Sequence, residues 1–198
     1  GKNVMTLTHF AIIAVCAYLL GSLSFAIIVS KLTLGKDIRN YGSGNAGLTN
    51  AYRTMGAKKT LLVLLGDIAK GAAAVSIGMV LAGPVGKLTA GIFVILGHMF
   101  PLYFGFKGGK GVLVGAVMLA FFDWRVFGIA FLLFVLAVAL TKWISLGSIL
   151  GAISFPITTW VFYRDPVLTA MALGMAAVVV FMHRSNIGRI IHGKENKF

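Results

Sequence analysis

Long, continuous apolar runs constrain this chain more than any other feature of its sequence. Of its 198 residues, 59% are hydrophobic and 12% are charged, and the mean hydropathy is +0.94. A soluble globular surface does not tolerate that balance. The short alternating segments of a membrane barrel are missing, so helices must satisfy the backbone polar groups in lipid. The sequence therefore predicts an all-α integral membrane protein with one transmembrane domain, residues 1–198.

Seven apolar stretches qualify as membrane spans. They cover residues 10–31, 60–82, 88–103, 112–122, 126–140, 144–162 and 166–182. We expect the first to be one continuous helix. The fourth and fifth are short, and a single helix over 112–142 is the alternative; it would be about 46 Å long, beyond a hydrocarbon core of about 30 Å. It would also carry Asp123 and Arg125 near its middle, so we predict a seven-transmembrane-helix bundle.

The basic residues are divided unevenly by these spans. One side collects 13 of the 18 lysines and arginines, whereas the other holds Lys2, Lys87, Arg125 and Arg164. The positive-inside rule then places the rich side in the cytoplasm, with the N-terminus outside and the C-terminus cytoplasmic. Topology and anionic lipid account for a net charge of +13. No aromatic stacking platform accompanies the charge, so nucleic acid is not an expected partner.

Three polar, glycine-rich segments interrupt the apolar runs: residues 37–50, 97–111 and 183–197. In the seven-span topology all three lie on the cytoplasmic face. Glycine allows backbone N–H groups to converge on an anion, and Lys, Arg, Asn and His add side-chain donors. The segments therefore predict a phosphate site at the membrane surface.

The first two segments supply most of the candidate site residues. From the first we select Arg39, Gly42, Ser43, Gly44, Asn45, Thr49 and Asn50, and from the second His98, Lys107, Gly108, Gly109 and Lys110. A plain interhelical turn is the alternative for the first. The second is similar to a phosphate loop without being a Walker A sequence, which argues against nucleotide hydrolysis. A histidine at a helix end is as suited to capping carbonyls as to chemistry.

Other candidates lie at helix ends and inside the second span. His183, Arg184, Asn186 and Arg189 follow the last span, where a basic membrane anchor is the alternative. Ser145 and Ser148 open the sixth span and suit either an anion site or an ordinary N-cap. Asp67 and Lys70 are spaced i, i+3 on one helix face, as a structural ion pair or as part of the site. The five acidic residues are too scattered for a two-metal site, so we expect no metal and no cofactor.

Together these motifs resemble the bacterial integral-membrane glycerol-3-phosphate acyltransferases that use acyl phosphate, the PlsY family. The likeness rests on residues 21–26 (GSLSFA), 42–50 (GSGNAGLTN), 67–71 (DIAKG), 97–111 (GHMFPLYFGFKGGKG), the Ser145/Ser148 pair and 183–197 (HRSNIGRIIHGKENK). It implies a seven-helix enzyme of the bacterial inner membrane with its active site on the cytoplasmic side. The implied reaction moves a fatty acyl group from acyl phosphate to the 1-hydroxyl of glycerol 3-phosphate, giving lysophosphatidic acid and phosphate.

The residues suit that chemistry, because both substrates carry phosphate and one carries a fatty chain. We expect Lys107, Lys110 and the loop amides to hold one phosphate, and Ser43, Asn45, Arg184 and Asn186 to hold the other or to polarise the acyl carbonyl. His183 is the candidate proton acceptor; a substrate phosphate that accepts the proton itself is the rival. The catalytic set is therefore His183, Asn186, Lys110 and Ser43. The expected partners are the two substrates, the bilayer and, transiently, the soluble enzyme that makes acyl phosphate.

Two other functions remain open at this point. A transporter of a phosphorylated metabolite would also need a basic pocket in a helical bundle, but the sequence has no inverted repeat and its outer half is apolar. A scaffold subunit would leave the glycine, lysine and asparagine clusters without a purpose. One-sided chemistry at the membrane surface is the prediction that uses all three polar segments.

Overall fold

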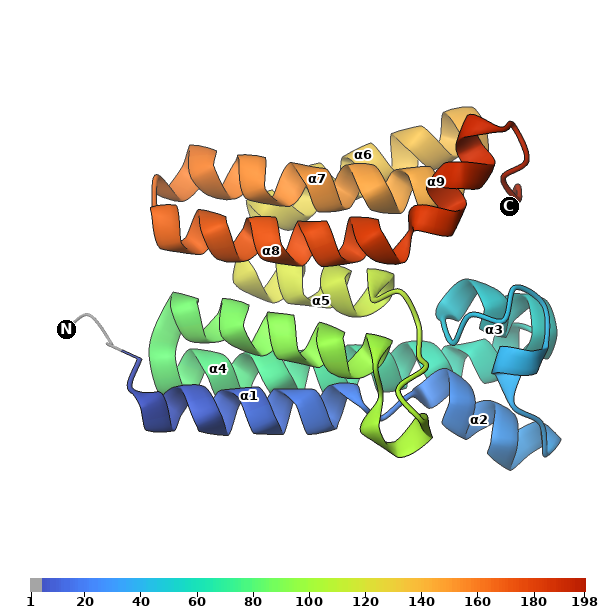
Figure 1. Cartoon of the computed structure of the whole chain (residues 1–198), viewed down its shortest axis with the longest axis horizontal. Coiled ribbons are helices and arrows are strands. Elements are labelled where there is room, and N and C mark those ends of the chain that lie inside the picture. Colours follow the sequence, from blue (N-terminus) through green and yellow to red (C-terminus); the bar gives the residue numbers. More distant parts are fainter. Residues whose placement is uncertain (1–4) are drawn as a thin grey trace. The chain divides into compact units, whose positions relative to one another are not determined.

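The computed structural model describes residues 5–198, which form helices and no strand. The α-helices are α1 (Leu7–Gly21), α2 (Phe25–Leu34), α3 (Leu48–Met55), α4 (Ala57–Met99), α5 (Val112–Phe122), α6 (Trp124–Thr141), α7 (Ile144–Tyr163), α8 (Pro166–Met182) and α9 (Arg184–Ile191). Two short 3-10 turns, Ile38–Asn40 and Leu102–Phe104, lie in the polar segments (Figure 1). The predicted all-α class is confirmed. Lys2, counted above on the poorer side, lies outside the described residues.

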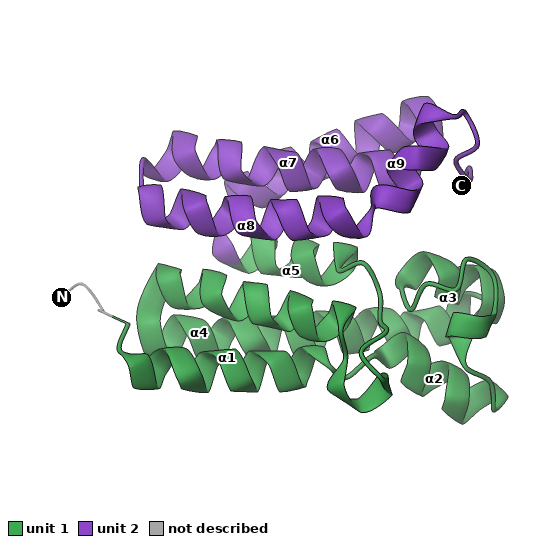
Figure 2. Ribbon diagram, viewed as in Figure 1, with its two compact units in different colours: residues 1–121 green, residues 122–198 purple. Residues whose placement is uncertain are grey.

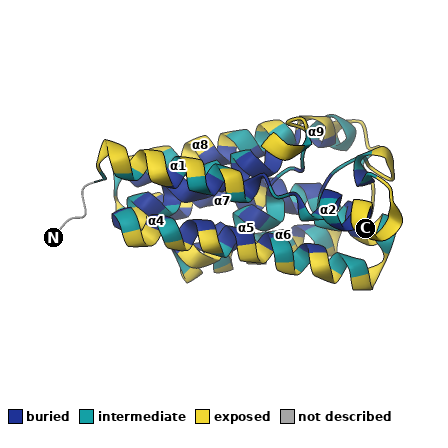
Figure 3. Cartoon of the chain, turned by 90° about the horizontal axis from the view of Figure 1, so that it is seen from below, coloured by how far each residue is buried: buried dark blue, intermediate teal, exposed yellow. Residues whose placement is uncertain are grey.

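Four stretches within residues 5–198 are long and apolar enough to cross a membrane. They are Leu7–Leu34, Ala57–Phe104, Trp124–Thr141 and Ile144–Tyr163, and a fifth is counted if α8 and α9, which meet at a 60° bend, form one span. Helix α5 is apolar but shorter. Exposed residues recur along α1 and α6 (Figure 3), and most of them are large and hydrophobic. Such surfaces suit contact with hydrocarbon rather than with water.

Helix α4 is a hairpin of two helical limbs. Ala82 and Gly83 leave the helical region, and Gly83 has φ of +59°, which favours glycine. Past this turn the chain reverses (Figure 1), and Gly86 lies so close to Gly78 that neither position has room for a Cβ atom. The two limbs match the separate spans predicted over residues 60–82 and 88–103.

The first span differs from its prediction as one continuous helix over residues 10–31. Helix α1 ends at Gly21, and α2 begins only at Phe25. The break leaves the carbonyls of Gly21 and Leu23 without helical partners, and both accept hydrogen bonds from the Lys70 ammonium. Hydropathy cannot reveal this interruption, because it depends on a donor from another helix.

The predicted interruption near Asp123 is confirmed. Asp123 has extended backbone angles between α5 and α6, and its carboxylate accepts a hydrogen bond from the Arg125 N–H as the N-cap of α6. A continuous helix over residues 112–142 is therefore excluded. Tyr163 donates to the same carboxylate at 2.8 Å, which ties the start of α6 to the end of α7.

The chain divides into two compact units, residues 1–121 and 122–198 (Figure 2). In the first, α1 packs along α4, and Gly21 and Gly97 let the backbones approach closely. A small core formed by Ala26, Ile27, Val29, Ile38, Ala46, Ala51 and Val63 lies beneath the first polar segment. In the second unit α7 packs against α6 and α8, and Phe122 contacts Phe155 and Tyr163.

Candidate functional site

Asn50 organises the first polar segment from its centre. Its side chain is 1% exposed, and Nδ2 donates to the carbonyls of Tyr41 and Asn45, both at 3.0 Å. Its Oδ1 accepts the backbone N–H of Ser43 at 3.1 Å. Asn50 was predicted to bind substrate, but these contacts commit its amide to the loop itself.

Two glycines permit the turn around Asn50. Gly42 and Gly44 have φ of +56° and +73°, values that side chains disfavour. A Cβ at Gly42 would also collide with Oδ1 of Asn50. The loop then enters α3 at Gly47, which offers no side-chain cap to the first turn of that helix. Ser43 is exposed, whereas Asn45 and Thr49 are half-buried.

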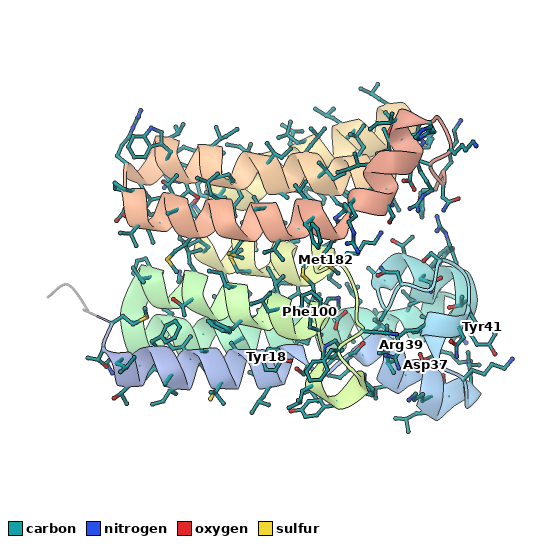
Figure 4. All side chains as sticks on the ribbon, viewed as in Figure 1. Tyr18, Asp37, Arg39, Tyr41, Phe100 and Met182 are labelled. Atoms are coloured by element: carbon teal, nitrogen blue, oxygen red, sulfur yellow. The ribbon has the colours of Figure 1, made fainter. Side chains whose placement is uncertain are left out.

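Arg39 joins the first polar segment to the second. Its Nε and Nη2 groups donate to the carboxylate of Asp37, with Nη2 at 2.7 Å from Oδ2 (Figure 4). Its Nη1 group donates to the carbonyls of Phe104 and Lys107 at 2.6 and 2.9 Å. Hydrogen bonding to Arg39 lowers the pKa of Asp37 to about 2. The guanidinium that was predicted to bind substrate thus uses most of its donors on the protein.

The second polar segment folds back on the end of α4. Gly108 N–H donates to the Met99 carbonyl at 2.9 Å, and Gly109 N–H donates to the His98 carbonyl at 3.1 Å. Neither glycine has room for a Cβ atom, because Gly108 lies against the His98 carbonyl and Gly109 lies between the His98 ring and the Ala46 carbonyl. The first two segments therefore meet at Gly109.

The break between α1 and α2 provides further attachment points for the second segment. Tyr18 hydroxyl donates to the Phe100 carbonyl at 2.7 Å (Figure 4), and Leu102 N–H donates to the Ser22 hydroxyl at 3.2 Å. Lys107 extends from this fixed backbone and is exposed, whereas Lys110 is half-buried. The loop thus presents two cations from a backbone held by α1, by the end of α4 and by Arg39 of the first 3-10 turn.

A buried polar cluster lies under this loop. Lys70 and Asp67 are almost fully buried, with Lys70 Nζ 3.1 Å from Asp67 Oδ1. Lys70 Nζ also lies 2.9 Å from Nδ1 of His98. The predicted i, i+3 contact is therefore present, and His98 belongs to the same cluster.

In the second unit, His183 stands at the corner between α8 and α9. It is 2% exposed, and its Nδ1 donates to the Val179 carbonyl at 2.8 Å. Because a carbonyl can only accept, Nδ1 carries the proton of the neutral ring and Nε2 carries the lone pair. His183 is thus held as a tautomer able to accept a proton at Nε2.

Asn186 and Arg189 follow on α9, and both contact Glu195 of the C-terminal tail. Asn186 Nδ2 donates to Glu195 Oε1 at 3.3 Å, and Arg189 Nε lies 3.4 Å from Oε2. The Glu195 side chain is 4% exposed. Sequence patterns do not single out this carboxylate, because Glu195 lies beyond the last helix, where periodicity carries no signal.

The remaining candidates of the second unit have less definite surroundings. Arg184 is exposed and donates to the Phe181 carbonyl at 3.2 Å, with its guanidinium over the Phe181 ring. Ser148 donates to the Ile144 carbonyl within its own helix. Ser145 is buried, and its hydroxyl finds no hydrogen-bond partner among residues 5–198. Within that same part of the chain, no cluster of His, Cys, Asp or Glu could hold a metal ion.

Fold and site together define a helical membrane protein with a glycine- and lysine-rich loop over residues 105–111, the candidate anion loop. A family model described as glycerol-3-phosphate acyltransferase matches residues 11–193. Glycerol-3-phosphate acyltransferase 2 of Bacillus anthracis is 40% identical over 195 residues, which cover 98% of each chain. The enzyme of Bacillus subtilis is 40% identical over 187 residues, 94% of this chain and 96% of that one.

Two solved structures share the fold. The crystal structure of PlsY, an integral membrane glycerol 3-phosphate acyltransferase, in its glycerol 3-phosphate form gives a TM-score of 0.88 at 34% identity, covering 96% of this chain and 95% of that one. The lysophosphatidic acid form gives 0.86 at 32% identity, with the same coverage. The chain therefore belongs to the PlsY family of integral membrane glycerol-3-phosphate acyltransferases.

Proposed function

We propose that this protein transfers a fatty acyl group from acyl phosphate to the 1-hydroxyl of glycerol 3-phosphate, releasing inorganic phosphate and forming lysophosphatidic acid. The observation that carries the proposal is the likeness, over 96% of the chain, to PlsY in a glycerol 3-phosphate form. The anion loop supports it, because two phosphate-bearing substrates require cationic donors on a fixed backbone.

The reaction divides into binding, attack and proton transfer. Lys107, Lys110 and the loop amides would hold one substrate phosphate, and Ser43 and Asn45 lie in the adjoining loop as further donors. The 1-hydroxyl oxygen would attack the acyl carbonyl carbon, and the carbon–oxygen bond to phosphate would then break, with phosphate as the leaving group. No step requires a cofactor or a metal.

His183 is the proposed acceptor of the hydroxyl proton. The hydrogen bond from Nδ1 to the Val179 carbonyl supports this role, because it leaves the lone pair on Nε2. The rival acceptor is a substrate phosphate, whose second pKa near 6 makes it largely dianionic at pH 7. Asn186 and Arg184 are proposed to assist by binding phosphate or polarising the acyl carbonyl.

The proposed setting is the bacterial cytoplasmic membrane, with the active site facing the cytoplasm. In the proposed topology the protein is one domain of seven spans, with the N-terminus outside and the C-terminus inside. The hairpin in α4 and the helix break at Asp123 support this count. A Cys16→Ser protein carrying a single new cysteine at Lys194 tests the orientation. In intact cells an impermeant thiol reagent should leave this cysteine unlabelled. Labelling would show that the C-terminus lies outside the cell, which would contradict the proposed topology.

A comparison of donors tests the reaction. Purified protein is given glycerol 3-phosphate with palmitoyl phosphate, palmitoyl-coenzyme A or palmitoyl-acyl carrier protein, and the lipid product is identified by mass spectrometry. We expect 1-palmitoyl lysophosphatidic acid from acyl phosphate alone. Product formed equally well from a thioester donor would refute the proposed donor while leaving the acyltransferase family assignment in place.

A further inference from the structure

Lys70 contacts more than the neighbouring carboxylate that its sequence spacing predicts. Its ammonium nitrogen lies 3.1 Å from the Gly21 carbonyl, 2.9 Å from the Leu23 carbonyl and 2.9 Å from Nδ1 of His98. The side chain is 1% exposed. Three acceptors match the three hydrogens of an ammonium group. Asp67 Oδ1, 3.1 Å away, balances the charge but accepts no hydrogen bond of acceptable geometry.

This arrangement fixes the protonation of His98. An ammonium group has no lone pair, so Nδ1 of His98 must accept, and the proton of the neutral ring must lie on Nε2. His183 has the opposite tautomer, because its Nδ1 donates to a carbonyl. His183 and His98 therefore differ in tautomer: Nε2 carries the lone pair in His183 and the proton in His98.

The His98 ring packs against the anion loop at Gly109. Gly109 lies against Nε2 of His98 on one side and against the Ala46 carbonyl on the other. The backbone of His98 accepts the Gly109 N–H as well. A ring of fixed orientation at this point thus sets where the Gly108–Gly109 backbone, and the lysines on either side of it, can lie.

We propose that Lys70 is a positioning residue that acts through His98. It holds the imidazole in the Nε2–H tautomer, and the ring in turn holds the loop that carries Lys107 and Lys110. The same ammonium also binds the Gly21 and Leu23 carbonyls, so the break between α1 and α2 supplies the acceptors that hold Lys70 in place. The kinetic part of the inference rests on the proposed function, because it assigns the loop to a substrate phosphate.

The protonation state of His98 can be measured without any turnover. Protein labelled with ¹⁵N-histidine in lipid bilayers contains four histidines, and the His98 signals are assigned from their loss in His98→Gln. We expect an unprotonated Nδ1 and a protonated Nε2 at His98, with the reverse at His183. A protonated Nδ1 at His98 would overturn the proposal, and because no activity is needed, a failure of the proposed function would not affect this result.

Removal of Lys70 requires care, because a lone substitution strands the buried Asp67 charge. The variant is therefore Lys70→Met combined with Asp67→Asn. Its matched control is Lys87→Met, which removes a lysine from the second limb of α4; Lys87 also donates to a backbone carbonyl, that of Phe121 at 2.8 Å. In the double variant we expect His98 to become a mixture of tautomers, while the control keeps the wild-type spectrum.

Kinetics separate a positioning role from a merely structural one. In the double variant, KM for one phosphate-bearing substrate should rise about tenfold with kcat changed less than threefold, because the loop is displaced while the reacting groups remain. Lys87→Met should leave both constants unchanged. His98→Asn, which keeps an acceptor near the Nδ1 position, should retain more affinity than His98→Leu. An unchanged KM in the folded double variant, or equal loss in both His98 variants, would overturn the proposal.

Discussion

The guanidinium of Arg39 donates through Nη1 to the backbone carbonyl of Lys107 at 2.9 Å, across 68 positions of the sequence. The same nitrogen reaches the Phe104 carbonyl at 2.6 Å. A cation that hydropathy would place at the membrane surface is therefore the link between two polar loops. The guanidinium is planar and has donors on more than one edge. One edge binds the Asp37 carboxylate while Nη1 binds the two carbonyls of the second loop.

Replacement of Arg39 by lysine should displace the anion loop. Lysine keeps the charge but cannot present donors to Asp37 and to two carbonyls together. We expect kcat/KM to fall about tenfold, largely through KM, in the phosphate-release assay. The control is Lys58→Arg, an opposite exchange at an exposed position of α4, which should be neutral. Full activity in Arg39→Lys would show that the planar guanidinium is dispensable.

The Asp37–Arg39 contact predicts how stability depends on pH. The pKa of Asp37 is lowered to about 2 from 3.8, so the folded protein binds a proton less readily than the unfolded chain. The resulting stabilisation is present above pH 4 and is lost as the pH falls toward 2. The difference in unfolding free energy between wild type and Asp37→Asn should therefore be constant from pH 7 to pH 5 and shrink below pH 4. A difference that disappears already between pH 7 and pH 5 would contradict this assignment.

Alanine at Gly109 should disrupt the loop where the first two polar segments meet. A Cβ there would collide with the His98 ring and the Ala46 carbonyl, and backbone on one side leaves little room to yield. We expect at least a hundredfold loss of acyl transfer. The matched control is Gly115→Ala in α5, where the nearest atom is Ile95 Cδ1 at 3.7 Å, and where alanine should be neutral or slightly stabilising. Equal activity of the two variants would show that the close approach does not matter.

Glu195 should be needed to hold the C-terminal tail on α9. Its carboxylate pairs with Arg189 and accepts from Asn186, so Glu195→Ala leaves a half-buried arginine without its counter-charge. We expect a lower Tm by a few degrees and reduced activity, because Asn186 loses a fixed orientation. Glu195→Gln, which keeps an acceptor for Asn186, should lose less. Lys194→Ala, at an exposed neighbour, should match wild type in both measurements.

Alanine at His183 separates the two proton acceptors. With Nδ1 held on the Val179 carbonyl, we expect a protein base at Nε2 and a loss of kcat beyond 10²-fold. His192 provides the control, because its Nδ1 contacts the Gly188 carbonyl at 2.7 Å in the same i, i−4 pattern but the ring is exposed. His192→Ala should remain active. A loss of only tenfold in His183→Ala would favour proton transfer to the substrate phosphate.

Residue patterns predicted where helices end and turn better than they predicted the contacts between helices. The end of α5 before Asp123 and the turn near Ala82 follow from chain length, charge and glycine, which are local signals. The break after Gly21 could not be foreseen, because it is stabilised by Lys70, about 50 positions away. A helix break that depends on a distant donor leaves no trace in hydropathy.

The candidate site shows the same division. The polar segments could be identified from the sequence, and Asn50 and Arg39 were predicted to bind substrate because their side chains are hydrogen-bond donors. The sequence could not say where those donors point, and the structure directs both mainly at the protein's own carbonyls and at Asp37. Glu195 was missed because an acidic residue in a basic tail has no helical register to mark it.

The most direct measurement is release of inorganic phosphate by purified protein given palmitoyl phosphate and glycerol 3-phosphate, without metal or nucleotide. We predict release that requires the acceptor, matches lysophosphatidic acid one to one, and falls at least a hundredfold in Lys110→Ala. Well-folded wild-type protein that releases no acceptor-dependent phosphate would contradict the proposed reaction.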